Sequence, residues 1–371
     1  MSPAFYGVRN VIDLKILIRV DASIDIGTGH VMRCVALAHA LHLQGHKIIF
    51  VCRDLPGNLC VLLEQWGYQV RRLHSFDILP DHWRRDIDDT ISVVAGLHFD
   101  WLIVDHYQLD ARWESVARTV AQKIMVIDDL ANRKHDCDVV LDQNLYGDMR
   151  TRYDGLVRSG CVQLLGPHFA LLRDEFLKAR QHLRLKDAQV HRILIFFGGS
   201  DPTNETSKAL QAIRLVGRVD IAVDVVVGTS NPHRVDIQKL CGELPSISYH
   251  CQTQNMADLM HAADIALGAG GSASWERCCV GLPAILIAVA DNQMMPAAEC
   301  AKAGAAYYLG VSAEVSVEQI KHAIERFLQA PQTLRSMTTC ALKLVDGLGV
   351  QRVINHLGEQ SVVMALPNPS V

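Results

Sequence analysis

The chain has 371 residues, of which 49% are hydrophobic and only 6% aromatic, and its formal net charge is −4. This length is enough for two domains with well-buried cores, and the composition is typical of a globular α/β enzyme. The mildly acidic charge argues against nucleic-acid or acidic-membrane partners, because the averaged field attracts neither.

The cysteines and the first residues bear on the cellular compartment. The eleven cysteines are scattered, odd in number and never spaced as Cys-x-x-Cys, so we expect reduced thiols. The first 13 residues lack the apolar core of a signal peptide. No apolar run approaches the roughly 18 residues that span a bilayer. We expect a cytoplasmic protein without membrane or nucleic-acid partners, most simply a monomer.

Strands and helices alternate along the first half of the chain without hairpin signals. Apolar runs predict strands at 15–20, 48–52, 70–73, 101–105, 124–128 and 139–142. Helices are predicted from His30 to a stop at Gly45, and at 59–66, 83–95 and 114–122. This order predicts a doubly wound parallel sheet.

A polar segment, 181–192, interrupts this pattern and is the expected linker. Beyond it, strands are predicted at 193–197, 222–227, 264–267 and 284–289, and helices ending near 215 and at 258–263, 296–303 and 349–357. The expected domains are an extension (1–14), a first α/β domain (15–180), a second (193–345), a C-terminal helix (346–357) and a tail (358–371). Two such halves place a ligand cleft between them, at the carboxyl ends of the strands.

The most informative turn, 270–272, follows an apolar strand and begins a helix that Gly281 ends. Its backbone N–H groups and the positive end of the helix dipole suit a phosphate. Ser272 and Glu276 share one helix face, with about 5–6 Å between their Cβ atoms. The spacing predicts a nucleoside diphosphate at Gly271 and Ser272, with Glu276 accepting hydrogen bonds from the ribose hydroxyls. The alternative is an ordinary strand-to-helix turn.

His30 is the candidate general base. It follows the glycine-containing loop 25–29 and begins a helix, whose dipole would lower the pKa of the imidazole and keep it neutral. Gly29 lets backbone and substrate approach closely. Asp21, at the end of the preceding strand, is the candidate for orienting His30 and for contacting substrate. The alternatives are a helix-capping histidine and a turn aspartate.

Three further candidates are expected on the same rim. Tyr107 follows a strand and is predicted to contact a sugar, unless it is a plain loop aromatic. Arg173 stands among apolar residues and needs an anionic partner, which is either a ligand phosphate or Asp174 or Glu175. Asn292 follows a strand and is predicted to reach a sugar or a phosphate.

A second glycine-containing turn, 198–201, has the features of a phosphate site, and Gly199 and Ser200 are its candidate residues. Metal binding has weak support, because Asp136-Cys137-Asp138 is a chance pattern without a surrounding cage of oxygen ligands. We therefore expect a small-molecule site without a metal or cofactor.

Several motifs, in the same order along the chain, resemble those of the PseG family, the UDP-2,4-diacetamido-2,4,6-trideoxy-β-L-altropyranose hydrolases of pseudaminic acid biosynthesis. The residues that carry the resemblance are Arg19–Ser23, Ile26–Cys34, Val104–Tyr107, Ile127–Arg133, Leu141–Leu145, Phe197–Asp201, Gly270–Gly281, Asp291–Gln293 and Asp346–Gly349. The second half also resembles the nucleotide-binding domain of MurG-type glycosyltransferases. This implies a GT-B fold, in which two Rossmann-like domains face a cleft.

The resemblance implies a role for each matching residue. His30 would be the catalytic base, and Arg173, Glu276 and Asn292 would bind the substrate. The implied reaction is attack by water on the anomeric carbon of a UDP-sugar, with inversion, releasing UDP and free sugar. Two alternatives stay open, an inverting MurG-like glycosyltransferase and a non-catalytic protein that binds nucleotide sugars.

Overall fold

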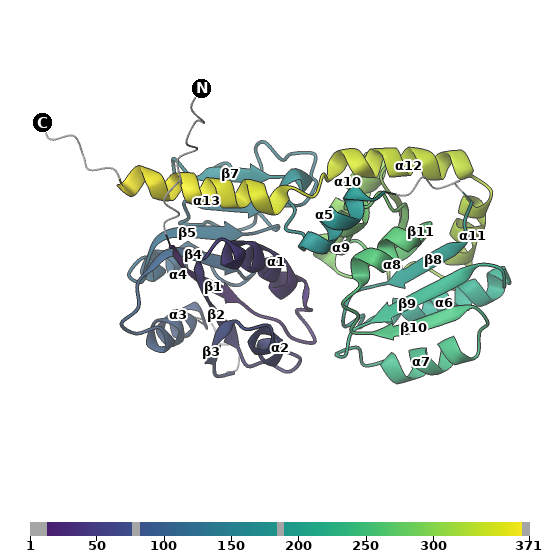
Figure 1. Ribbon diagram of the computed structural model, residues 1–371, viewed down its shortest axis with the longest axis horizontal. Coiled ribbons are helices and arrows are strands. Elements are labelled where there is room, and N and C mark those ends of the chain that lie inside the picture. Colours follow the sequence, from purple (N-terminus) through teal and green to yellow (C-terminus); the bar gives the residue numbers. More distant parts are fainter. Residues whose placement is uncertain (1–12, 76–81, 184–188, 366–371) are drawn as a thin grey trace, which may run out of the picture.

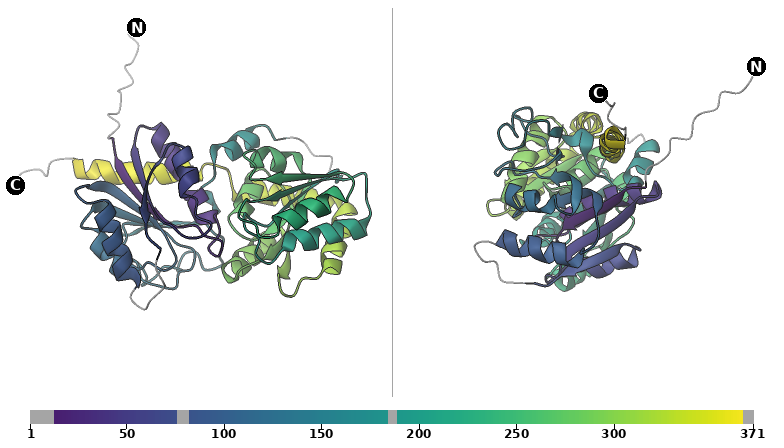
Figure 2. Two further views of the ribbon diagram at one scale, coloured as in Figure 1. Left: turned by 90° about the horizontal axis from the view of Figure 1, so that it is seen from below. Right: turned by 90° about the vertical axis from the view of Figure 1, so that its left-hand side faces the viewer.

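The computed structural model describes residues 13–75, 82–183 and 189–365, so nearly all of the expected extension lies outside the described residues. The described chain forms two lobes that lie side by side, each built on one parallel sheet (Figures 1 and 2). Among the described residues, no helix is both long and apolar enough to cross a membrane.

The N-terminal sheet has seven strands in the order β3-β2-β1-β4-β5-β6-β7. They are β1 (Lys15–Val20), β2 (Lys47–Arg53), β3 (Gln69–Leu73), β4 (Phe99–Asp105), β5 (Ala121–Ile127), β6 (Val139–Asp142) and β7 (Val162–Leu165). The helices of this lobe are α1 (Gly29–Leu43), α2 (Cys60–Gln65), α3 (His82–Val93) and α4 (Ala111–Ala117). The central strands are nearly continuous apolar runs because helices cover both faces of the sheet.

The C-terminal sheet has six strands in the order β10-β9-β8-β11-β12-β13. They are β8 (Arg192–Phe196), β9 (Ala222–Val227), β10 (Ile247–Cys251), β11 (Ile265–Ala269), β12 (Ala284–Ala288) and β13 (Tyr307–Val311). The helices are α6 (Glu205–Val216), α7 (Arg234–Gly242), α8 (Met256–Ala262), α9 (Ala273–Cys279), α10 (Asp291–Lys302), α11 (Val317–Leu328) and α12 (Pro331–Leu344). Two apolar clusters pack on opposite faces of this sheet.

Each sheet has a point where the order of its strands reverses, between β1 and β4 in one lobe and between β8 and β11 in the other. Open α/β sheets bind ligands at this point, beyond the carboxyl ends of the strands. The loops after β1 and β4 lead to His30 and Tyr107. The loops after β8 and β11 contain the turns 198–201 and 270–272.

The chain passes to the second lobe earlier than the expected linker, 181–192. After the short 3-10 helix η1 (Pro167–Phe169), helix α5 (Asp174–Gln181) already packs on the C-terminal lobe. Its Phe176 is fully buried in one cluster with Leu194 and Trp275. The chain therefore crosses between the lobes before α5, because the apolar side of this helix packs in the core of the C-terminal lobe.

The last helix returns to the first lobe. Helix α13 (Gly349–Ala365) lies across the N-terminal lobe in Figure 1, where it is yellow. Its Val353, Ile354 and Leu357 belong to the same buried cluster as Leu41 of α1. The helix also runs beyond the expected end at 357 and takes up the first part of the expected tail.

Candidate active site

A cavity of about 590 Å³ lies between the two lobes, at the carboxyl ends of their strands. Ten of the eleven predicted site residues line it, and Asp21 does not. The ten are Gly29, His30, Tyr107, Arg173, Gly199, Ser200, Gly271, Ser272, Glu276 and Asn292. The structure therefore brings residues from both halves of the chain to one place.

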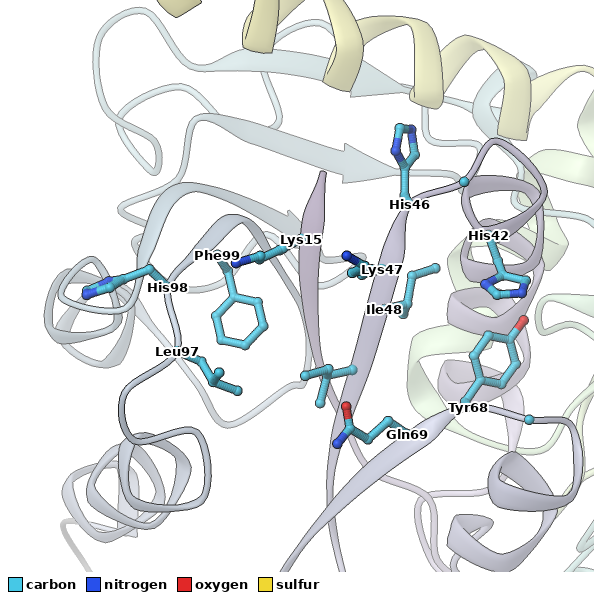
Figure 3. Close-up of a pocket in the computed structure, with 13 residues that line it drawn as sticks. Lys15, His42, His46, Lys47, Ile48, Tyr68, Gln69, Leu97, His98 and Phe99 are labelled. Atoms are coloured by element: carbon cyan, nitrogen blue, oxygen red, sulfur yellow. The ribbon is translucent and has the colours of Figure 1, made fainter. Parts of the chain in front are cut away.

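A second cavity, of about 550 Å³, lies at the amino ends of β1 and β2 (Figure 3). Its lining includes Lys15, His46 and Phe99, and none of the predicted site residues contributes to it. Parallel α/β sheets bind their ligands at the opposite, carboxyl ends of the strands. The cavity between the lobes is therefore the candidate active site.

His30 is the second residue of α1, and its exposed fraction is 9%. Its Nδ1 lies 2.6 Å from Oδ1 of Asp105, the last residue of β4. An ionised carboxylate can only accept hydrogen bonds, so Nδ1 carries the proton and Nε2 of the neutral ring is the acceptor. A carboxylate fixes the tautomer of the general base in the same way in serine protease triads.

Arg33 holds Asp105 in place from the next turn of α1. Its Nε and Nη2 donate to the two carboxylate oxygens of Asp105, each at 2.7 Å. Nη2 also lies 3.1 Å from Nδ1 of His30, but both atoms carry protons, so this contact is not a hydrogen bond. Burial alone raises the pKa of Asp105, but the charge and hydrogen bonds of Arg33, together with the contact from His30, outweigh it and hold the pKa well below its ordinary range. Asp105 therefore stays ionised beside His30.

Asp21 does not orient His30, so that prediction is wrong. One of its oxygens accepts a hydrogen bond from Nη2 of Arg19 at 2.8 Å, and the other accepts from the backbone N–H of Arg53 at 2.7 Å. Arg19 lies in β1 and Asp21 follows the strand two residues later, so both side chains lie on the same side of the chain. Because Arg19 is fully buried, it requires this counter-charge. Asp21 belongs to that buried network rather than to the cavity.

Tyr107 lies between the base and the C-terminal lobe. Its ring packs edge-on against His30, with 4.6 Å between the ring centroids. Its hydroxyl oxygen accepts a hydrogen bond from Nδ2 of Asn292, in the first turn of α10, at 2.7 Å. Burial raises the pKa of Tyr107, so the hydroxyl stays protonated. The structure thus joins two predicted site residues from different lobes.

Arg173 pairs with two carboxylates. Its Nη1 lies 2.8 Å from Glu175 and its Nη2 lies 3.6 Å from Glu276. The sequence left the partner of Arg173 open, and Glu175 is one of the residues it offered. The side chains of Arg173 and Glu276 are 26% and 19% exposed, so both keep surface toward the cavity. Burial raises the pKa of Glu276, although the charge of Arg173 opposes this shift.

The turn 270–272 has the strand–turn–helix geometry that was predicted, between β11 and α9. A Cβ atom at Gly270 would lie 2.9 Å from the Cβ of Ala297, so this position requires glycine. The Ser272 hydroxyl does not cap α9. A Cβ at Gly29 would lie 3.8 Å from the Ser272 Oγ, which shows how closely the loops of the two lobes approach.

The second turn, 198–201, lines the cavity and stays a predicted phosphate site, but it does not lead directly into a helix. Helix α6 begins only at Glu205, and the carboxylate of Asp201 accepts from the backbone N–H groups of Glu205 and Thr206 at 3.0 and 2.9 Å. These N–H groups are therefore not open to a phosphate. Gly199 instead allows close approach of the lobes, since a Cβ there would lie 3.1 Å from Oγ1 of Thr28.

Within the part of the chain that the structure describes, no group of three or more His, Cys, Asp or Glu side chains is placed to hold a metal ion. Asp136 and Asp138 each pair with Arg118, at 3.0 Å. Their charges are used in a structural ion-pair cluster.

Sequence reasoning did not assign roles to four polar residues that line or support the cavity. Arg33 and Asp105 hold the imidazole, and Asp129 and Asn144 line the cavity from the loops after β5 and β6. Three of them, Asp105, Asp129 and Asn144, lie at or just beyond the carboxyl end of an apolar strand. That shared position was the available signal.

Comparisons with known proteins agree with this architecture. Residues 193–353 match the glycosyltransferase family 28 C-terminal domain. The chain is 27% identical to the spore coat polysaccharide biosynthesis protein SpsG of Bacillus subtilis, over 92% of this chain and 98% of that protein. It is 28% identical to the UDP-2,4-diacetamido-2,4,6-trideoxy-beta-L-altropyranose hydrolase of Campylobacter jejuni, over 78% of this chain and 97% of that protein.

The crystal structure of MurG from Acinetobacter baumannii superposes with a TM-score of 0.65 at 15% identity, covering 93% of this chain and 99% of that one. The resemblance to the hydrolase family is therefore confirmed as sequence similarity to a named member, and the fold prediction is confirmed as well. The chain has the GT-B fold, and its residues 193–353 are similar in sequence to the glycosyltransferase family 28 C-terminal domain.

Proposed function

We propose that this protein hydrolyses a UDP-linked 2,4-diacetamido-2,4,6-trideoxy sugar to UDP and free sugar. The observation that carries the proposal is the buried His30, which Asp105 holds through Nδ1, in the same cavity that Tyr107 and the turn 270–272 line. The similarity to the Campylobacter jejuni hydrolase supports the substrate class, and the family 28 domain supports a nucleotide sugar.

The chemistry begins at His30. Nε2 takes a proton from water while the water oxygen attacks the anomeric carbon, and Nδ1–H stays hydrogen-bonded to Asp105. The bond between that carbon and the diphosphate oxygen breaks, and UDP leaves with the electron pair. Attack on the face opposite UDP inverts the configuration through an oxocarbenium-like transition state.

The C-terminal lobe holds the leaving group. Backbone N–H groups at Gly271 and Ser272 stabilise the growing negative charge on the diphosphate, so no general acid is needed. Arg173 adds a positive charge, since its guanidinium lines the cavity beside Glu276. Glu276 accepts hydrogen bonds from the ribose hydroxyls. Asn292 and Tyr107, already joined across the cavity, contact the sugar.

The second candidate is an inverting glycosyltransferase, and the family 28 match favours it. Both reactions use the same nucleotide half of the cavity, and they differ in the nucleophile. His30 is nine-tenths buried and covered on one side by the ring of Tyr107. A water molecule reaches such a base more easily than the hydroxyl of a large acceptor does. This geometry favours hydrolysis.

Incubation with the UDP-sugar in ¹⁸O-water, without any acceptor, separates these functions. A hydrolase releases UDP at a steady rate and places the label on the anomeric carbon of the inverted sugar. Label on the phosphate of UDP contradicts attack at carbon. UDP release that requires an added acceptor identifies a transferase, and binding without release identifies a non-catalytic protein.

The base is tested by His30→Gln, which keeps a polar side chain but cannot accept the proton. We expect kcat to fall by at least about 100-fold, the usual lower range for a general base, while UDP affinity stays the same. His46→Gln is the matched control, because His46 is also buried but lines the remote cavity of Figure 3. Equal losses of kcat and UDP affinity in His30→Gln would contradict its role as base.

A further inference from the structure

A line of buried hydrogen bonds runs from α9, in the C-terminal lobe, toward the base. Nε1 of Trp275, the third residue of α9, donates to Oδ1 of Asn144 at 3.0 Å. Nδ2 of Asn144 donates to Oδ2 of Asp129 at 3.3 Å. All three side chains belong to residues that are at most 9% exposed. Water therefore offers them few alternative partners, and each depends on the next.

The line continues through the N-terminal lobe. Nη1 of Arg33 donates to the same Oδ2 of Asp129 at 3.2 Å, and the rest of the guanidinium holds both oxygens of Asp105. Asp105 accepts from His30. Asp129 and Asp105 thus share one guanidinium. If Asp129 loses its hydrogen bond from Asn144, it attracts Arg33 more strongly, and Arg33 then holds Asp105 less firmly.

Each link has one possible direction. The indole N–H can only donate, and the carboxylate of Asp129 can only accept. Together they fix the amide of Asn144, with its oxygen toward Trp275 and its nitrogen toward Asp129. Without the indole donor, the amide is free to turn and withdraw its N–H from Asp129. Asp129 then competes more strongly for Arg33.

Within this line, the bond between Trp275 and Asn144 is the one that joins the two lobes. Trp275 lies in the first turn of α9, three residues after Ser272, so the helix connects it to the residues proposed to hold the diphosphate. The bond forms when the C-terminal lobe is docked as it is in this structure. The state of the nucleotide-binding lobe is thereby connected to the side chain that would activate water.

We propose that the hydrogen bond from Trp275 to Asn144 couples docking of the nucleotide-binding lobe to the orientation of the His30 base. Trp275 and Asn144 are positioning residues, which act through Asp129, Arg33 and Asp105. The kinetic part of this inference rests on the proposed hydrolase function. Its spectroscopic part does not, because UDP alone is the ligand used.

The test is Trp275→Phe, which removes the donor and keeps an aromatic ring in the core. We expect kcat to fall on the order of tenfold, with UDP affinity unchanged, because the base is misplaced rather than lost. In the UDP-saturated protein, the downfield proton resonance of His30 Nδ1–H should broaden or disappear as its bond to Asp105 loosens. Assignment of that resonance comes from its absence in His30→Gln.

Trp113→Phe is the matched control. Trp113 is also fully buried, and its Nε1 donates to a carboxylate oxygen of Asp86 at 3.0 Å, away from the cavity. This variant should keep both kcat and the resonance. If Trp275→Phe also keeps both, the coupling is refuted.

Asn144→Ala breaks the same bond from the other lobe, and it carries the test if Trp275→Phe does not fold. In the double variant the losses in kcat should not add, because both changes interrupt the same line of hydrogen bonds. Additive losses refute the coupling. If the wild type releases no UDP from the UDP-sugar, the proposed function fails, while loss of the resonance in Trp275→Phe still supports the coupling.

Discussion

Asp105→Asn is the most demanding test of the candidate active site, because it changes one atom and leaves the shape unchanged. Nδ1 of His30 and the guanidinium of Arg33 now donate to the two oxygens of Asp105, and the thiol of Cys34 adds a longer contact at 3.5 Å. Asparagine offers only one oxygen. Arg33 is charged and directs two N–H groups at this site, so it takes the oxygen and leaves the amide NH₂ facing Nδ1.

The tautomer of His30 then reverses. Nδ1 has to accept a hydrogen bond from the amide, so Nε2 carries the proton and no longer accepts one from water. The same substitution in the serine protease triad lowers kcat about 10⁴-fold. A similar loss is expected here, which corresponds to about 5 kcal/mol in the activation free energy at roughly 1.36 kcal/mol per factor of ten. UDP affinity should not change.

Stability has to be separated from activity in this experiment. Removing the carboxylate charge also leaves Arg33 with less compensation, and breaking a buried ion pair typically costs about 3–5 kcal/mol of unfolding free energy. Asp86→Asn is the control, because Asp86 is a buried carboxylate paired with Arg19 and Arg53 outside the cavity. Both variants should unfold at lower urea concentration, but only Asp105→Asn should lose kcat. A folded Asp105→Asn protein with kcat within tenfold of wild type would refute the reasoning.

Two further predictions concern other carboxylates. Glu276→Gln should raise the Kd for UDP about tenfold, as expected for loss of a charged hydrogen-bond acceptor, and should remove the preference for UDP over 2′-deoxy-UDP in calorimetry. An unchanged preference would show that Glu276 does not contact the ribose. Burial raises the pKa of Asp142 to about 7, above the roughly 3.9 of an unfolded chain, so folding favours its protonated form. Relative to Asp142→Asn, wild-type stability to urea should be fully present below about pH 4, fall by up to about 1.4 kcal/mol per pH unit, and level off above about pH 7. Parallel pH profiles for the two proteins would contradict this shift.

The sequence predicted the central strands well because their signal is local. β1, β6 and β9 coincide with the predicted 15–20, 139–142 and 222–227. Helices bury both faces of these strands, so each reads as an apolar run between polar residues. The strands β7, β10 and β13, which were not among the predicted strands, are edge strands of the two sheets and are only partly buried.

The helices show the limits of the same reasoning. The predicted helix 114–122 ends at Ala117, because the following residues pair with β4 as strand β5. The pairing of β5 with β4 depends on the tertiary structure, so no pattern within residues 114–122 indicates it. Helix α11 is not among the predicted helices, although it carries a local amphipathic signal, with Ile320, Ala323, Ile324 and Phe327 on its buried side.

The residues of the candidate site likewise fall into those with a local sequence signal and those that only the fold brings together. Glu276 and the turn before it were predictable because they lie within one strand–turn–helix segment. The partner of His30 was not, because Asp105 lies 75 residues away. It reaches His30 because β4 pairs with β1, which places Asp105 opposite Val20. Asp21 is nearer to His30 in the sequence, but its carboxylate pairs with the buried guanidinium of Arg19 instead.

The return of α13 to the first lobe has a consequence for biosynthesis. Val353, Ile354 and Leu357 fill part of the N-terminal core, yet the ribosome makes them after the whole second domain. The first domain to emerge therefore keeps an open apolar groove beside α1 throughout translation of the second. Premature stop codons near residue 349 should consequently damage the domain that was made first, and chaperones that shield apolar surface should bind such nascent chains.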